Sequence, residues 1–77
     1  MLLGNEEEVK KRLIKEEDDL SRLFVNLSAF MQSNDYDKLP LMEQNLMFLQ
    51  KQCMSMYSNI LNMRIGLIEK RIDKIQF

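Results

Sequence analysis

The chain has 77 residues, of which 45% are hydrophobic, and a net charge of −1. This length predicts one small domain, whose core alone supplies only about 3–5 kcal/mol, and the near-neutral charge argues against a broad DNA or RNA footprint. One cysteine and no histidine exclude an internal disulfide and an ordinary zinc site, which leaves self-association as the common remaining source of stability.

Targeting and membrane signals are not apparent in the sequence. No apolar run approaches the ~20 residues that a bilayer-crossing helix requires. The first residues, MLLG, lack the basic region and long apolar segment of a secretory signal. With a single cysteine, these features predict a cytoplasmic protein without a membrane partner.

The first predicted helix covers about residues 5–32. Asn5 can cap free backbone N–H groups, and the acids at 6–8 suit the positive end of the helix dipole. Apolar residues then recur at helical spacing: Val9, Leu13, Leu20, Phe24, Leu27 and Met31, widened by Leu23 and Phe30.

A polar loop over about residues 33–39 separates this helix from a second one over about residues 40–75. Pro40 fits the first position of that helix, where its missing N–H costs nothing. Gly66 is the only weak point beyond it. The short connection predicts an all-α fold, an antiparallel two-helix hairpin in a single domain.

The second helix carries two apolar stripes, more than one partner helix can cover. One is a heptad-like series: Leu46, Leu49, Cys53, Met56, Ile60, Met63 and Leu67. The other comprises Met47, Met54, Tyr57, Leu61, Ile68 and Ile75, flanked by Ile65 and Ile72. The excess predicts a homo-oligomeric helical bundle, a dimer or a tetramer built from dimers.

Charge gathers at one end of the predicted hairpin. More than half of the charged side chains lie in residues 1–22, and others lie in residues 63–77. An antiparallel hairpin brings these segments together, so we expect one ionic pole. The middle of the chain is rich in Asn, Gln, Ser and Met, which fits either a packed oligomer interface or a binding surface.

Catalytic chemistry is poorly represented. Neighbouring acids such as Glu16–Glu17 and Asp18–Asp19 point about 100° apart on a helix, and Lys15 and Arg22 are near enough to pair with them. Cys53 has no histidine to activate it, and we interpret it as a small core residue. The sequence predicts neither enzyme activity nor a cofactor or metal site.

The best candidate for binding is a polar and apolar stripe on the second helix. Gln50, Met54, Tyr57, Leu61 and Arg64 follow steps of four and three residues, so they share one helix face. A Tyr ring can stack on a base, an Arg fork matches phosphate, and Gln can read a base edge. The alternative is a buried Tyr–Arg–Gln network that fixes the register of the oligomer.

These residues form part of a longer pattern: Leu20-x3-Phe24-x2-Leu27-x2-Phe30-Met31, then Leu39-Pro40-x3-Gln44, then Leu49-Gln50-x3-Met54-x2-Tyr57-x3-Leu61-x2-Arg64-Ile65. Over about residues 16–65 it resembles a family of small two-helix phage proteins first labelled from a crAss-like phage. That family resembles in turn the phage sponge proteins that bind messengers of CBASS and Thoeris defence without cleaving them.

The resemblance implies binding of a small anionic nucleotide between protomers. Tyr57 would stack on a base, Arg64 and Lys51 would meet phosphate, and Gln50 completes the predicted site. Asn26 stands where the family often has Lys, which removes one phosphate contact. The first hypothesis is thus a non-catalytic immune-evasion protein that sequesters a nucleotide messenger. The alternative is a helical module that binds and inhibits or recruits a host or phage protein.

Overall fold

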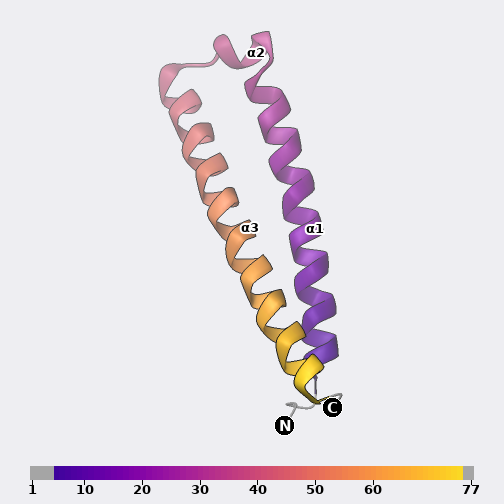
Figure 1. Ribbon diagram of the computed structural model, residues 1–77. Coiled ribbons are helices and arrows are strands. Elements are labelled where there is room, and N and C mark those ends of the chain that lie inside the picture. The colour runs from indigo at the N-terminus through magenta and orange to yellow at the C-terminus, as the bar shows by residue number, and fades with distance from the viewer. Residues whose placement is uncertain (1–4, 76–77) are drawn as a thin grey trace.

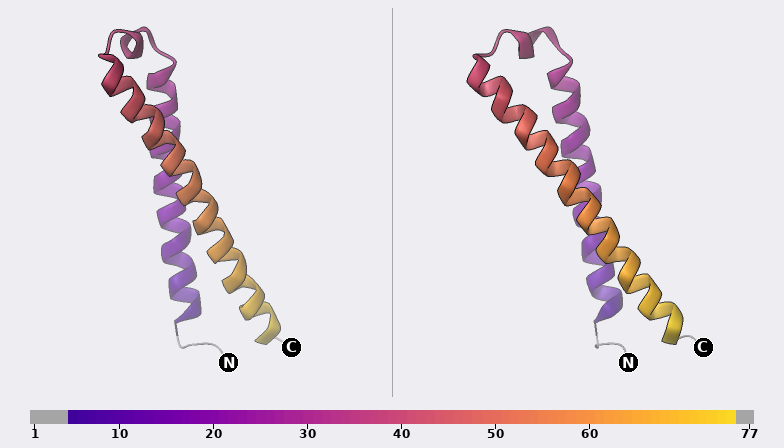
Figure 2. Two further views of the ribbon diagram at one scale, coloured as in Figure 1. Left: turned by 90° about the vertical axis from the view of Figure 1, so that its left-hand side faces the viewer. Right: turned by 60° about the vertical axis from the view of Figure 1, so that its left-hand side comes forward.

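The computed structural model describes residues 5–75, and the side chains of residues 5–72. It contains α1 (Glu6–Met31), α2 (Asn34–Asp37) and α3 (Leu41–Ile75). The two long helices run antiparallel and cross at an angle, with α2 at one end of the pair (Figures 1 and 2). The hairpin measures 57 × 16 × 15 Å. The predicted all-helical hairpin is confirmed, although the loop contains the short helix α2.

The start of α1 differs from the expectation in one respect. The Asn5 side chain makes no capping hydrogen bond, so its predicted role as a cap is wrong. Its φ and ψ of −135° and 26° lie outside the extended region in which a capping side chain turns back toward the first N–H groups. The Asn5 carbonyl still accepts the N–H of Val9 at 2.8 Å, and three acids occupy the first turn.

Hydrogen bonds from two side chains hold the loop against the start of α3. The Tyr36 hydroxyl donates to the Gln44 carbonyl at 3.0 Å, and the Gln44 amide donates to the Leu39 carbonyl at 2.9 Å. The rings of Tyr36 and Phe30 meet edge to face, with 6.4 Å between their centroids. The turn is thereby tied to both long helices.

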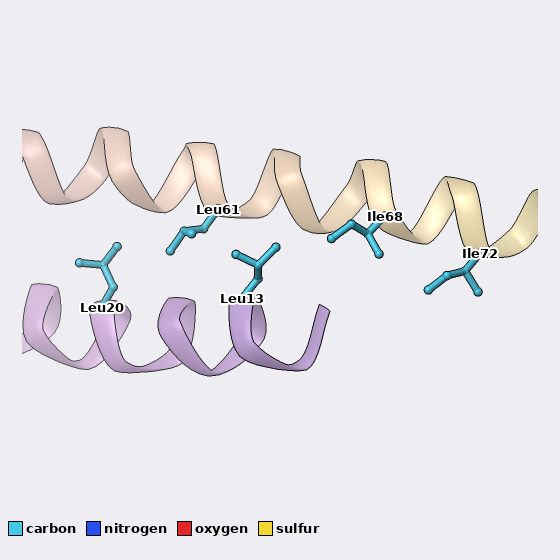
Figure 3. Close-up of a cluster of buried hydrophobic side chains, with 5 residues drawn as sticks. All are labelled: Leu13, Leu20, Leu61, Ile68 and Ile72. Atoms are coloured by element: carbon cyan, nitrogen blue, oxygen red, sulfur yellow. The ribbon is translucent and has the colours of Figure 1, made fainter. Parts of the chain in front are cut away.

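The core between α1 and α3 is small. Leu61 is fully buried and points toward α1 between Leu13 and Leu20 (Figure 3). Ile68 and Ile72 continue the cluster toward the C-terminal end of α3. Most of the second predicted stripe of α3 therefore packs on α1, but its member Tyr57 is exposed, and the side chain of Ile75 lies outside the described residues. On α1 the stripe is narrower than expected, because Leu23 and Phe30 are exposed.

The expected ionic pole is present. Arg71 donates from Nε to both carboxylate oxygens of the buried Glu6, at 3.1 and 3.2 Å, and from Nη2 at 3.0 Å. Lys10 lies 3.8 Å from Glu69. These pairs join the first turns of α1 to the last turns of α3, the two segments in which the sequence concentrates charge.

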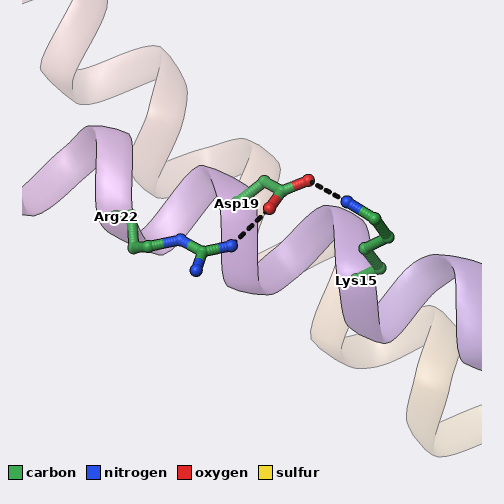
Figure 4. Close-up of polar contacts among 3 residues, drawn as sticks. All are labelled: Lys15, Asp19 and Arg22. Carbon is green, nitrogen blue, oxygen red and sulfur yellow. Dashed lines mark hydrogen bonds and ion pairs between the residues drawn. The ribbon is translucent and has the colours of Figure 1, made fainter.

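Among the acids in the middle of α1, Asp19 belongs to an ion-paired face, as the spacing predicted, whereas Glu17 faces α3. Lys15 and Arg22 both donate to Asp19 from neighbouring turns of α1 (Figure 4). These two hydrogen bonds lower the pKa of Asp19 below its ordinary value, and the hydrogen bond from Lys15 has the larger effect. Glu17 instead accepts the hydroxyl of Ser58 across the helix pair, at 2.8 and 3.0 Å.

The heptad-like stripe of α3 faces away from α1. We call it the outer stripe, and it begins one member earlier than the sequence alone indicated. Its members are all exposed: Met42, Leu46, Leu49, Cys53, Met56, Ile60, Met63 and Leu67. Cys53 is therefore not a core residue of the single chain, which corrects the interpretation made from its apolar neighbours. Those neighbours are themselves outside the core.

Among the described residues, none of the helices combines the length and apolar character of a segment that spans a bilayer.

Candidate ligand-binding groove

The polar residues of the predicted site form a row along one edge of α3. Gln50, Tyr57 and Arg64 recur every seven residues, and Arg71 extends the row by one more step. Because successive helix residues turn by about 100°, this row lies between the face that packs on α1 and the outer stripe. We call these four residues the edge row. Met54 and Leu61, the apolar members of the predicted stripe, point instead toward α1.

Beside Arg64 the surface is hollowed. One hollow of about 350 Å³ and another of about 260 Å³ share Val9 and Arg64, so they form one continuous groove between α1 and α3. The groove is lined by Val9, Arg12, Leu13, Glu16, Arg64, Leu67, Ile68 and Arg71. Apolar side chains thus form part of its wall, with charged groups around them.

Positive charge dominates this groove. Arg71 is paired with Glu6, whereas neither Arg12 nor Arg64 has an ion pair among the residues that the structure describes. Glu16 is the one acid that lines either hollow. Two guanidinium groups facing a partly apolar groove can each offer paired N–H donors to a phosphate or carboxylate.

Tyr57 and Gln50 lie farther along the same edge. Tyr57 is 42% exposed and Gln50 is exposed, so neither is buried in the single chain. Each step of seven residues separates the backbone positions by roughly 10 Å along the helix. No hydrogen bond joins Gln50, Tyr57 and Arg64 within residues 5–72. Within the single chain these residues therefore form no network, and the alternative considered above concerns contacts between protomers.

Lys51 does not join the groove. Its ammonium group lies 5.5 Å from the centre of the Phe24 ring, a distance at which a cation is attracted to the aromatic face. Phe24 lines a smaller hollow of about 130 Å³, together with Ser21, Ser55, Ser58, Asn59 and Leu20. On α3, Ser55 and Ser58 lie on the other flank of the side that packs on α1, away from the edge row. The predicted site is thus split between two surfaces.

Sequence reasoning missed Arg12 and Arg71. The seven-residue interval from Gln50 through Arg64 leads directly to Arg71, so that signal was available. Arg12 lies on α1, and only the antiparallel alignment of the helices brings it near Arg64. Its position in the charged first helix carries no local signal that separates it from neighbouring Lys and Arg residues.

The family model named Sequestin matches residues 7–67. The chain belongs to the Sequestin family. The match to Sequestin includes Arg12, Gln50, Tyr57 and Arg64, so it covers most of the edge row and two of the three arginines that line the groove. It ends at Leu67, the last residue of the outer stripe. Neither the curated proteins nor the solved structures contain a match to the chain.

Within residues 5–72, no group of three or more metal-ligating side chains comes together.

Proposed function

We propose that this chain is a non-catalytic phage immune-evasion protein that binds and sequesters a small anionic nucleotide messenger between protomers. The observation that carries the proposal is the arginine groove of Arg12 and Arg64 in a chain of the Sequestin family. The family name itself suggests sequestration. The nucleotide, the phage origin and the defence system are part of the proposal.

The groove offers the two kinds of contact that a nucleotide requires. The guanidinium groups of Arg12 and Arg64 can each present two parallel N–H groups to phosphate oxygens. Val9 and Leu67 provide apolar surface at the same place, and the exposed ring of Tyr57 provides a stacking face on the same edge. An anion with a planar, partly apolar group fits this combination better than an inorganic anion does.

The length of the edge row favours a site that two protomers share. Gln50 and Arg64 are fourteen residues apart, which is roughly 20 Å along α3. A mononucleotide or a cyclic dinucleotide cannot contact both ends of such a row in one chain. If a second chain placed its own edge row on the same face, binding groups from the two chains would lie closer together than Gln50 and Arg64 do in one chain.

Binding without turnover fits the residue types around the groove. The sequence has no histidine, and Cys53 lies on the outer stripe rather than in the groove. Arg, Tyr and Gln bind and orient anions well, but at neutral pH they are weak general bases. Sequestration asks only for affinity, and the contacts named above supply it.

The test is a thermal-shift and calorimetry screen of the purified protein against cyclic dinucleotides, cyclic trinucleotides and cyclic ADP-ribose isomers. A ligand at 100 times its dissociation constant should stabilise the folded state by about 2.7 kcal/mol. Heat denaturation of the complex should then release the ligand unchanged, as chromatography and mass spectrometry would show. A cleaved product would contradict the non-catalytic assignment.

Two substitutions with a matched control assign the site. Arg12→Gln and Arg64→Gln should each weaken binding by about tenfold or more, since each removes a charged hydrogen-bond donor. Arg22→Gln removes an arginine from the same helix as Arg12 but from a pair with Asp19 outside the groove, so it should leave the affinity unchanged. Equal losses in all three variants, or no bound nucleotide in the screen, would rule out the proposed site.

A second function is favoured by the exposed outer stripe. An amphipathic helix with an unpartnered apolar face can bind a groove of another protein and inhibit or recruit it. In that case Arg12→Gln and Arg64→Gln should leave partner binding intact, whereas a charge on the outer stripe should abolish it.

A further inference from the structure

The outer stripe is an unusual surface for a folded chain. Its leucines, isoleucine and methionines at 42–67 are between 48% and 69% exposed. They occupy alternating intervals of three and four residues, the a and d positions of a heptad repeat, along about seven turns of α3. A straight seam of this length fits another long helix much better than it fits a globular surface.

We propose that the outer stripe binds the outer stripe of a second copy of this chain, with the two α3 helices antiparallel about a two-fold axis near residues 54 and 55. In an antiparallel pair, each a position faces a d position. One register matches every member of the stripe with another member: Met42 with Leu67, Leu46 with Met63, Leu49 with Ile60, and Cys53 with Met56, each twice. A shift by one heptad places Lys70 opposite Leu46 and leaves apolar residues unmatched.

The residues beside the seam support this register independently. On the edge-row side, it brings Glu43 of one copy level with Arg64 of the other, to within roughly 3 Å along the axis. It likewise brings Gln50 level with Tyr57 of the other copy. The opposite side pairs Gln52 with Asn59. The charged groups that meet are thus of opposite sign, and the two-fold axis repeats each pair.

A parallel arrangement has no such complementarity. It would also bury the outer stripe, but it would set Arg64 beside Asn59 of the second copy, leave Glu43 without a basic neighbour on the α3 of that copy, and place Lys70 beside Lys70. No pair of opposite charges would cross the seam. Since both arrangements bury the same apolar side chains, the charges decide between them.

The antiparallel dimer also completes the candidate groove, a step that rests on the proposed function. The two-fold axis keeps both edge rows on one face. Gln50 of one copy then lies level with Tyr57 of the other, and Arg64 of the other copy is roughly 8 Å from Gln50 along the axis. Glu43 of the second copy occupies one side of the Arg64 guanidinium. Arg has five N–H donors in a planar fork, so the remaining side stays available for a phosphate.

Substitutions on two exposed apolar residues of α3 test the seam without any nucleotide. Ile60→Glu puts a charge in the middle of the outer stripe, whereas Phe48→Glu puts one on an equally exposed residue outside it. Sedimentation equilibrium should show a dimer, or a multiple of it, for the wild-type chain and for Phe48→Glu. Ile60→Glu should raise the dissociation constant at least tenfold. A monomeric wild type, or equal effects of both substitutions, would overturn the proposal.

Charge reversal tests the register, and recovery in the double variant separates a lost contact between copies from a failure to fold. Glu43→Arg and Arg64→Glu should each weaken the dimer by about tenfold, and the double variant should recover most of the loss. Both residues are exposed in the single chain, so their folding can be checked by circular dichroism. Losses that simply add in the double variant would show that these residues do not meet.

The orientation can be measured directly. In a Cys53→Ser chain, a spin label at Glu69→Cys lies on the side of α3 away from the seam. Antiparallel pairing separates the two labels by roughly 40 Å, and parallel pairing by less than about 20 Å. Pulsed electron paramagnetic resonance measures the distance between the two labels. The longer distance supports the proposal, and the shorter one contradicts it. Because no nucleotide is present, failure here is separate from failure of the sequestration hypothesis.

Discussion

Leu61 is the residue on which the single hairpin depends most. It is fully buried between Leu13 and Leu20, in a core that contains few other side chains. Truncation of a buried leucine costs about 2–5 kcal/mol, which is comparable to the whole stability of a domain of this size. We therefore expect Leu61→Ala to be largely unfolded at 25 °C in urea titrations followed by circular dichroism.

Leu23→Ala is the matched control for this prediction. The same atoms are removed from a leucine that is 55% exposed, so the change in unfolding free energy should stay within about 0.5 kcal/mol. Comparable losses in the two variants would show that the core between α1 and α3 is placed elsewhere.

Asp19 gives a prediction on pH. Hydrogen bonds from Lys15 and then Arg22 hold its pKa below the ordinary value of 3.8. A carboxyl group with a lowered pKa in the folded state stabilises that state above pH 3.8, and the contribution disappears as the pH falls through the lowered pKa. Carboxylate titration by NMR should give a pKa below 3.8 for Asp19.

Substitution of the donors should reverse this shift. Lys15→Gln removes the larger cause, so the pKa of Asp19 should rise toward 3.8, and Arg22→Gln should raise it less. Lys11→Gln, one helix turn before Lys15, should leave the pKa of Asp19 lowered. If Lys11→Gln has the same effect as Lys15→Gln, general charge rather than the hydrogen bond sets the pKa.

At the scale of the elements, Gly66 is the one weak point within α3. The helix continues through it, and a Cβ added there meets no atom within 4 Å in the single chain. Gly66→Ala should therefore stabilise the protein by roughly 0.5–1 kcal/mol, because alanine loses less backbone freedom on folding. Urea denaturation at one protein concentration measures the change. A destabilised variant would mean that another chain approaches Gly66 closely.

The sequence predicts the helices well and their partners less well. Glycine, proline and apolar spacing define α1 and α3 because these signals act within a few residues. Which stripe of α3 would meet α1 was not predictable, since both stripes are apolar, and Cys53 was misplaced for the same reason. The α2 turn depends on Tyr36 and Gln44, whose hydrogen bonds join residues on different elements.

The candidate groove shows the same division. Tyr57 and Arg64 were identified from their interval on one helix, a local signal. Arg12 lies beside Arg64 only through the tertiary alignment of α1 with α3, and the ammonium group of Lys51 lies against the Phe24 ring instead. Spacing along one helix identifies a shared edge, but the neighbouring helix decides which residues of that edge border a hollow.

The whole molecule is long and thin, with a core on one side of α3 and an apolar stripe on the other. If the outer stripe pairs with a second copy, folding and association are one equilibrium, and the melting temperature must depend on protein concentration. Unfolding absorbs about 0.7 kcal/mol per residue, so a dimer of this length should gain roughly 5 °C in Tm for each tenfold increase in concentration.

Differential scanning fluorimetry and calorimetry over a hundredfold range of concentration check this dependence. Ile60→Glu should flatten it and lower the Tm at high concentration, because the stripe then carries a charge that a second copy cannot accommodate. Phe48→Glu, outside the stripe, should keep the wild-type slope. A Tm independent of concentration in the wild-type chain would mean that the small core of Leu13, Leu20 and Leu61 stabilises the hairpin alone, and that the outer stripe is free for a different protein.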